Sequence, residues 1–155
     1  MVISTQKGGL RWREVWSARV GPLRRAAVSD DLYQQGLKIR KEVLGEEYVN
    51  RALANLNSFN APLQELVTEY CWGKLWGRAG LDRRQRSLLN LAMIGVLNRP
   101  HELRAHLRGA LTNGVTPQEI SEVFLQVAIY AGVPAAVDSF RVANELFAES
   151  GITPT

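Results

Sequence analysis

Between residues 30 and 149, apolar side chains recur at helical spacing, and each apolar stretch lies between a helix-start signal and a helix-stop signal. The strongest start signal is Thr116-Pro117-Gln118-Glu119, because Thr and Glu three residues apart can form a capping box and proline fits the first helical turn. The clearest stop signal is Asn113-Gly114, since both residues tolerate the left-handed backbone that ends many helices. No stretch alternates as a half-buried strand would. The pattern therefore predicts an all-α fold.

We expect a single-domain bundle of about six or seven helices. Asp30 or Asp31 would cap the first helix, Asn60 the third, and Asp82 the fourth, where Gln85 would complete a capping box. The fourth helix is apolar nearly all round and should lie at the centre of the bundle. The expected helices occupy residues 32–44, 46–56, 60–76, 82–97, 100–113, 116–131 and 134–149.

Length and composition exclude several other classes of protein. The 155 residues suffice for one domain with a sizeable core. A single cysteine, Cys71, excludes an intramolecular disulfide, and we expect a small buried hydrophobic side chain there. We expect no structural zinc site, because the chain has only two histidines and no cysteine cluster. No stretch reaches the roughly 18 uninterrupted apolar residues that cross a bilayer, so we expect no membrane partner.

The basic charge is concentrated at the N-terminus. Residues 1–28 carry a net charge of +5, whereas residues 29–155 sum to −1. This weakens any nucleic-acid role, which would need a basic face on the fold itself. We expect residues 1–29 to form a disordered or loosely docked basic arm before a helical domain at 30–155. A targeting role, or a natural start near Val28 that leaves the arm untranslated, remains an alternative.

One short stretch, residues 98–108, gathers unusual chemistry. It holds both histidines of the chain, and a helix opening at Pro100 would place Glu102 and His106 on one face. A carboxylate beside an imidazole fixes one tautomer and raises its basicity. The alternative is a solvated helix face with an ordinary ion pair.

Several segments resemble the carboxymuconolactone decarboxylase family, which is related in fold to the alkylhydroperoxidase-D proteins. The resemblance covers residues 31–149, about four-fifths of the chain, and the similar segments follow one another in order and at family-like spacing. They are NLNSFN at 55–60, WGKLWGRAGL at 72–81, RSLLNLAM at 86–93, NRPHELRAHLR at 98–108, NGVT at 113–116 and QVAIYAGVPAA at 126–136.

The resemblance implies which branch of the family applies. The peroxidase branch needs a Cys-x-x-Cys pair, and here Arg99 and Glu102 occupy those positions. Dithiol peroxidase chemistry is therefore excluded. The resemblance instead implies a cytoplasmic, cofactor-free carboxy-lyase of protocatechuate catabolism, which converts 4-carboxymuconolactone to the β-ketoadipate enol-lactone.

That reaction sets demands on the residues. The leaving CO2 sends its electrons into the lactone carbonyl, so an oxyanion needs hydrogen-bond donors and a ring carbon needs a proton. We expect His106 to be the proton donor or oxyanion stabiliser, and Glu102 to orient and charge it. Arg86 and Arg99 are the candidates for gripping the substrate carboxylates.

Each of these assignments has a structural alternative. His106 and Arg86 could instead hold helices together. Trp72 and Trp76 form an aromatic strip that could line the substrate site, although core or interface packing is the stronger interpretation. Arg104 and Arg108 should face solvent or another subunit. The family also implies a homo-oligomer, a trimer or a hexamer.

Two other functions remain open at this point. The same fold could serve another cofactor-free lyase or isomerase, acting on a related lactone or keto acid, because a few pocket residues decide the substrate. Alternatively, the chain could be a non-catalytic oligomeric helical protein whose arm binds an acidic partner.

Overall fold

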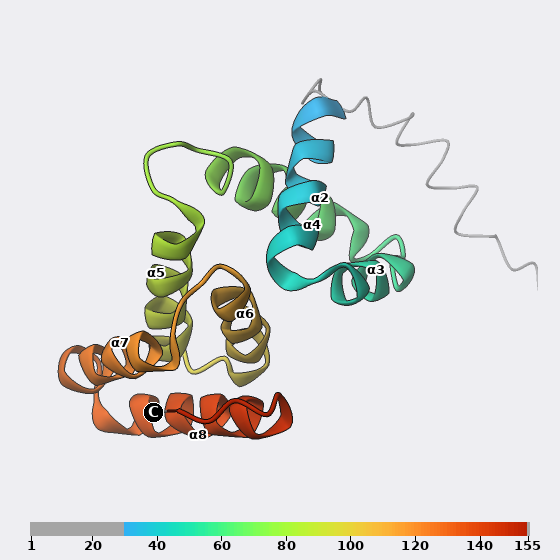
Figure 1. The fold of residues 1–155 in the computed structure, drawn as a ribbon. Coiled ribbons are helices and arrows are strands. Elements are labelled where there is room, and N and C mark those ends of the chain that lie inside the picture. Colours follow the sequence, from blue (N-terminus) through green and yellow to red (C-terminus); the bar gives the residue numbers. More distant parts are fainter. Residues whose placement is uncertain (1–29, 155) are drawn as a thin grey trace, which may run out of the picture.

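The computed structural model describes residues 30–154, and all regular elements in that range are helical (Figure 1). The predicted all-α fold is therefore confirmed. The predicted basic arm at 1–29 lies outside the described residues. In chain order the elements are α2 (Asp30–Leu44), α3 (Glu46–Ala54), α4 (Ala61–Leu66), η1 (Val67–Leu75), α5 (Arg83–Val96), α6 (Pro100–Thr112), α7 (Pro117–Tyr130) and α8 (Val133–Glu149).

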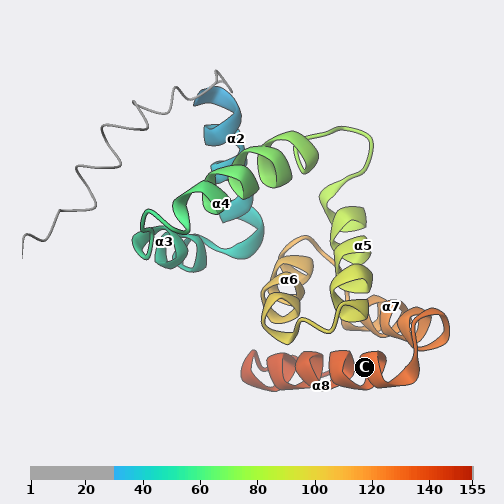
Figure 2. The same cartoon turned by 180° about the vertical axis from the view of Figure 1, so that it is seen from behind.

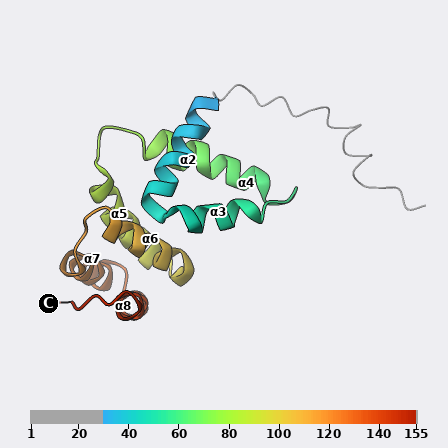
Figure 3. The same cartoon turned by 45° about the vertical axis from the view of Figure 1, so that its right-hand side comes forward.

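Helices α2, α3 and α4–η1 form one group, in which α4 and η1 run on as a single rod across α2 (Figures 2 and 3). Glycines allow this close crossing. A Cβ on Gly36 would lie 2.0 Å from the Thr68 carbonyl oxygen, and a Cβ on Gly73 would lie 2.5 Å from that of Leu32. The two backbones therefore approach each other more closely than any larger residue permits.

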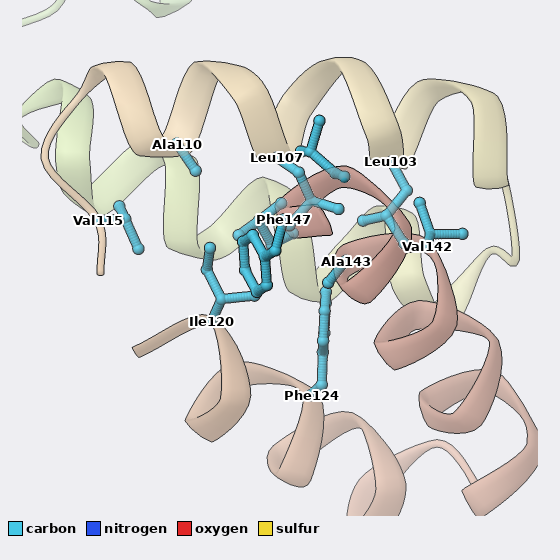
Figure 4. Packing of buried hydrophobic residues seen from close by; sticks show 11 residues of the cluster. Leu103, Leu107, Ala110, Val115, Ile120, Phe124, Val142, Ala143 and Phe147 are labelled. Carbon is cyan, nitrogen blue, oxygen red and sulfur yellow. The ribbon is translucent and has the colours of Figure 1, made fainter. Parts of the chain in front are cut away.

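Helices α5 to α8 form the second group around a continuous hydrophobic core (Figure 4). Leu107 of α6 and Phe124 of α7 are fully buried in it, and Phe124 meets Phe140 edge to face with ring centroids 5.5 Å apart. Helix α5 packs against α6, α7 and α8, as the predicted central position requires. Its outer face is nevertheless open, because Met93 is 55% exposed.

Helix α6 joins the two groups. It packs against α2, where a Cβ on Gly109 would meet the Val43 side chain at 2.9 Å. An ion pair between Arg83 and Glu42, 2.7 Å apart, adds a second link between α5 and α2. Residues of α6 therefore face both groups of helices.

The helix ends follow the sequence signals closely. Both predicted capping boxes are present, Asp82 with Gln85 and Thr116 with Glu119. Gly114 has a φ of 82°, in the left-handed region expected for a helix stop. The predicted start of α8 at Pro134 is one residue late.

Three predictions about helix ends were wrong. Asp31 lies inside α2 rather than capping it, because the helix already includes Asp30. Helix α3 ends at Ala54, two residues before the predicted Leu56. Asn60 precedes α4 but makes no side-chain cap, since its Oδ1 accepts instead from the backbone N–H of Asn57.

The third predicted helix also differs in kind. It ends at Leu75, one residue before the predicted Trp76, and Val67–Leu75 is a π-helix. The Trp76 N–H donates to the Cys71 carbonyl oxygen five residues earlier. Cys71 in this segment is half-buried, and burial raises the pKa of its thiol. Among residues 30–154, no helix is long and apolar enough to cross a membrane.

Candidate functional site

Helix α6 presents the predicted Glu102 and His106 from a well-defined start. Asn98, with a φ of 48°, turns the chain, and Pro100 occupies the first turn of the helix. Glu102 is exposed and His106 is half-buried. No hydrogen bond joins these two side chains among the described contacts, but the Glu102 carboxylate acts on the imidazole by its charge.

The ring next to His106 belongs to Trp72 of η1. The two rings are stacked, with centroids 6.2 Å apart and planes 6° apart. Trp72 also contacts Trp76, with centroids 4.8 Å apart. Both tryptophans are buried, at 2% and 4% exposure, so they pack in the core cluster and offer almost no surface to a ligand.

Burial changes the acidity of His106. Desolvation lowers its pKa below the ordinary value of 6.5, and the Glu102 carboxylate opposes this shift only in part. The expected increase in basicity was therefore wrong in its net direction. The neutral imidazole, with one N–H donor and one acceptor nitrogen, is the favoured form near pH 7.

Arg86 of α5 is buried, with 8% of its surface exposed. One Nη2 hydrogen bond goes to the Arg78 carbonyl oxygen, at 3.2 Å, in the loop that follows η1. Its Nε is buried without a hydrogen-bond partner, and no carboxylate pairs with it among the described residues. A buried guanidinium in this state is costly unless an anion approaches it.

The remaining predicted arginines divide into two kinds. Arg99 is exposed at the start of α6 and has no ion pair within the described part of the chain. Its backbone is not helical, with a φ of −113° and a ψ of 79°, because it precedes the first turn of α6. Arg104 and Arg108 instead pair with Glu149 of α8, so they link helices within the subunit.

Arg40 is a buried polar residue that the sequence reasoning did not single out. Its Nη1 donates to Thr68 Oγ1 at 3.2 Å, while its Nε has no partner. Burial lowers the pKa of this guanidinium. Its position on the apolar face of α2, one residue after Ile39, was the available signal.

These contacts bring three of the predicted residues together, Trp76, Trp72 and His106. Arg86 binds the loop two residues after Trp76, Trp76 contacts Trp72, and Trp72 stacks on His106. The desolvated imidazole of His106 suits stabilisation of a developing oxyanion, and the buried guanidinium of Arg86, which has no carboxylate partner among the described residues, suits binding of a small organic anion. Within residues 30–154, no three His, Cys, Asp or Glu side chains gather as a metal site would require.

The structure is therefore a small all-α domain that carries an imidazole stacked on a buried indole and, on α5, a buried guanidinium. The chain is a member of the carboxymuconolactone decarboxylase family, whose model matches residues 61–145.

Named relatives agree with this assignment. The chain is 47% identical over 122 residues to the 4-carboxymuconolactone decarboxylase of Acinetobacter baylyi, covering 79% of this chain and 91% of that protein. It is 48% identical over 114 residues to the nitrosuccinic acid decarboxylase of Metarhizium robertsii, covering 74% and 80% respectively. A 4-carboxymuconolactone decarboxylase of Pseudomonas putida is 42% identical over 41 residues, covering 26% of this chain and 85% of that protein.

Proposed function

We propose that the protein is a carboxy-lyase that decarboxylates 4-carboxymuconolactone to the β-ketoadipate enol-lactone. The observation that supports this function most is the buried Arg86, whose Nε has no hydrogen-bond partner among the described residues. A dicarboxylate substrate would supply the anion that Arg86 lacks. The relatives that carry decarboxylase names support loss of CO2 as the reaction.

The residues divide the work as follows. Arg86 and Arg99 hold the two substrate carboxylates, and the conjugated lactone itself takes up the electron pair that CO2 leaves behind. The neutral His106 donates its N–H as a hydrogen bond to the resulting oxyanion. The ring carbon then receives this proton while the other imidazole nitrogen takes up a proton from solvent, so the imidazole is neutral again after the step. Glu102 orients the imidazole through its charge.

Turnover of the purified lactone tests this proposal directly. The wild-type protein should release CO2 from 4-carboxymuconolactone, and Arg86→Lys should mainly raise KM because a point charge replaces a two-bond grip. Arg104→Lys is the matched control, since Arg104 pairs with Glu149 inside the subunit.

Nitrosuccinate must be assayed beside the lactone. The relative named for that acid is as similar to this chain as the one named for the lactone. A higher kcat/KM on nitrosuccinate would contradict the lactone as the substrate, while leaving decarboxylation in place.

We also propose a homo-oligomer, a trimer or a hexamer, that acts in the cytoplasm. Exposed apolar side chains support self-association, because single large patches on soluble proteins usually mark contact surfaces. Ile129 and Tyr130 of α7 are 79% and 84% exposed, and Leu63 of α4 is 58% exposed. The place of the reaction in protocatechuate catabolism is part of the same proposal.

A further inference from the structure

We propose that Trp72 is the positioning residue for His106: its indole ring fixes the plane of the imidazole and keeps water from one face of it. Trp72 does not touch substrate in this role, and it acts only through the imidazole. The consequence for turnover rests on the proposed function, whereas the effect on the imidazole itself does not.

The geometry carries this assignment. The ring planes differ by only 6°, and a centroid separation of 6.2 Å falls within the range of offset stacking. Among the described residues, no side-chain hydrogen bond holds the imidazole, so ring stacking is the contact that defines its plane. Trp72 can serve as a fixed platform because it is itself 2% exposed.

The platform is rigid because three neighbours hold it. Trp76 contacts the indole from the same segment, and Ile39 and Val43 of α2 belong to the same buried cluster. The next residue, Gly73, lies against the Leu32 backbone, which fixes the distance between η1 and α2. An imidazole on α6 therefore rests on a ring that is anchored to a different group of helices.

The indole has two effects on the pKa of His106, and they act in opposite directions. Excluding water from the imidazole disfavours the charged form, whereas an indole face attracts a cation. At 6.2 Å the imidazole lies at the outer limit of the cation–π range of roughly 6 Å. Burial is also the largest cause of the pKa shift, which is downward. Loss of the indole should therefore raise the pKa.

Other charges near α6 do not account for this direction. Glu102 is the one charged group that acts on His106, and it raises the pKa. The neighbouring elements carry further titratable groups toward α6 or the buried cluster, but none of them is a cause of the shift. They are Arg40 on α2, Cys71 on η1, Arg86 on α5, and Glu145 and Glu149 on α8.

The imidazole can be observed directly, because the chain holds only two histidines and the other, His101, is exposed. NMR titration of the ring C–H signals should be run on the full-length wild type and on two matched pairs of variants. One pair is Trp72→Phe and Trp76→Phe, and the other is Trp72→Leu and Trp76→Leu. Trp76 is the control because it lies in the same buried cluster without the stacking contact to His106.

We expect the His106 pKa to rise in Trp72→Phe, to rise further in Trp72→Leu, and to change much less in the matching Trp76 variants, because Trp76 acts on the imidazole only through Trp72. If Trp72→Leu does not fold, by circular dichroism, the phenylalanine pair decides. An unchanged pKa in the folded Trp72 variants, a downward shift, or an equal shift in the Trp76 variants would each overturn the assignment.

Kinetics give a second measurement. Trp72→Leu should lower kcat by roughly tenfold or more with little change in KM, since the oxyanion donor is misplaced while the arginines remain. Trp72→Phe should retain most of the kcat that Trp72→Leu loses. A rise in KM with unchanged kcat would overturn the positioning role. If the wild type does not decarboxylate the lactone, the proposed function fails, and the NMR titration still tests Trp72 and His106.

Discussion

His101 and His106 belong to the same helix, α6, yet they occupy different environments. His101 is exposed in the first turn of α6, whereas His106 is half-buried against an indole. Five residues along an α-helix correspond to a rotation of about 140° around its axis. This rotation places His101 on the solvent side of α6 and His106 on its inner side. The chemical difference between the two imidazoles therefore comes from position and not from residue type.

Replacing His106 should affect turnover strongly. We expect His106→Ala to lower kcat by roughly 100-fold or more, the scale of a lost proton-transfer group. Glu102→Gln should lower it less, because the imidazole remains while its charged neighbour is lost. Steady-state assays on variants with wild-type circular dichroism give both values. Wild-type turnover in His106→Ala would show that the imidazole is structural.

The lowered pKa of His106 also predicts a pH dependence of stability. The unfolded chain binds the proton more tightly than the folded one, so this stabilising contribution is present in full above about pH 6.5. It is lost as the pH falls toward the folded pKa. The free energy of unfolding should therefore drop less between pH 7.5 and pH 5 in His106→Gln than in the wild type.

Urea titrations at both pH values measure this difference. His101→Gln serves as the control for removing an exposed imidazole from the same helix. An identical drop in the free energy of unfolding of the His106→Gln and wild-type proteins would contradict the lowered pKa of His106.

At the scale of single residues, the sequence predicted which side chains matter better than it predicted their burial and their contacts. Glu102 and His106 were predicted on one helix face, because a spacing of four residues requires it. The burial of Arg86 and the stacking of Trp72 on His106 depend on contacts between η1, its loop, α5 and α6. Local spacing carries no information on such contacts, so the net direction of the His106 pKa was predicted wrongly.

At the scale of elements, the crossing of α2 and η1 depends on glycine. Gly36→Ala should destabilise the protein even though alanine is the better helix former by about 1 kcal/mol. The new Cβ would meet the Thr68 carbonyl oxygen at 2.0 Å, and this backbone atom cannot move without shifting the whole of η1. Thermal unfolding should show a clearly lowered Tm.

Gly80→Ala is the matched control, because a Cβ there meets nothing within 4 Å. Its Tm should equal or slightly exceed the wild-type value, since alanine reduces the freedom of the unfolded chain. An unchanged Tm in Gly36→Ala would show that the crossing has room to adjust.

The sequence predicted most helix ends and missed one helix type. Capping boxes are local hydrogen-bond patterns, so Asp82 and Thr116 marked the starts of α5 and α7 correctly. A π-helix has no comparable local signal, because its backbone pattern is stabilised here by packing against α2. Residues 60–76 therefore read as an ordinary helix.

For the whole molecule, the apolar outer faces predict an assembled state. Ile129 is 79% exposed on α7, and burying such a side chain in a subunit contact stabilises by about 1.5–3 kcal/mol. Ile129→Glu should therefore shift the protein toward smaller species in light scattering. Asn144→Glu, at an exposed polar position on α8, should leave the wild-type assembly intact. A wild type that is monomeric at micromolar concentration would contradict the oligomer.

The π-helix ties the placement of Trp72 to the number of residues between α4 and the loop before α5. Each residue added to or removed from a regular helix rotates everything beyond it by about 100°. A one-residue deletion at an exposed position such as Lys74 would allow the ordinary i→i+4 pattern to replace the wider turn that now ends at Trp76. The backbone would become more regular, while the indoles would no longer face their present neighbours. In this segment, chain length is under a geometric constraint that substitution alone does not reveal.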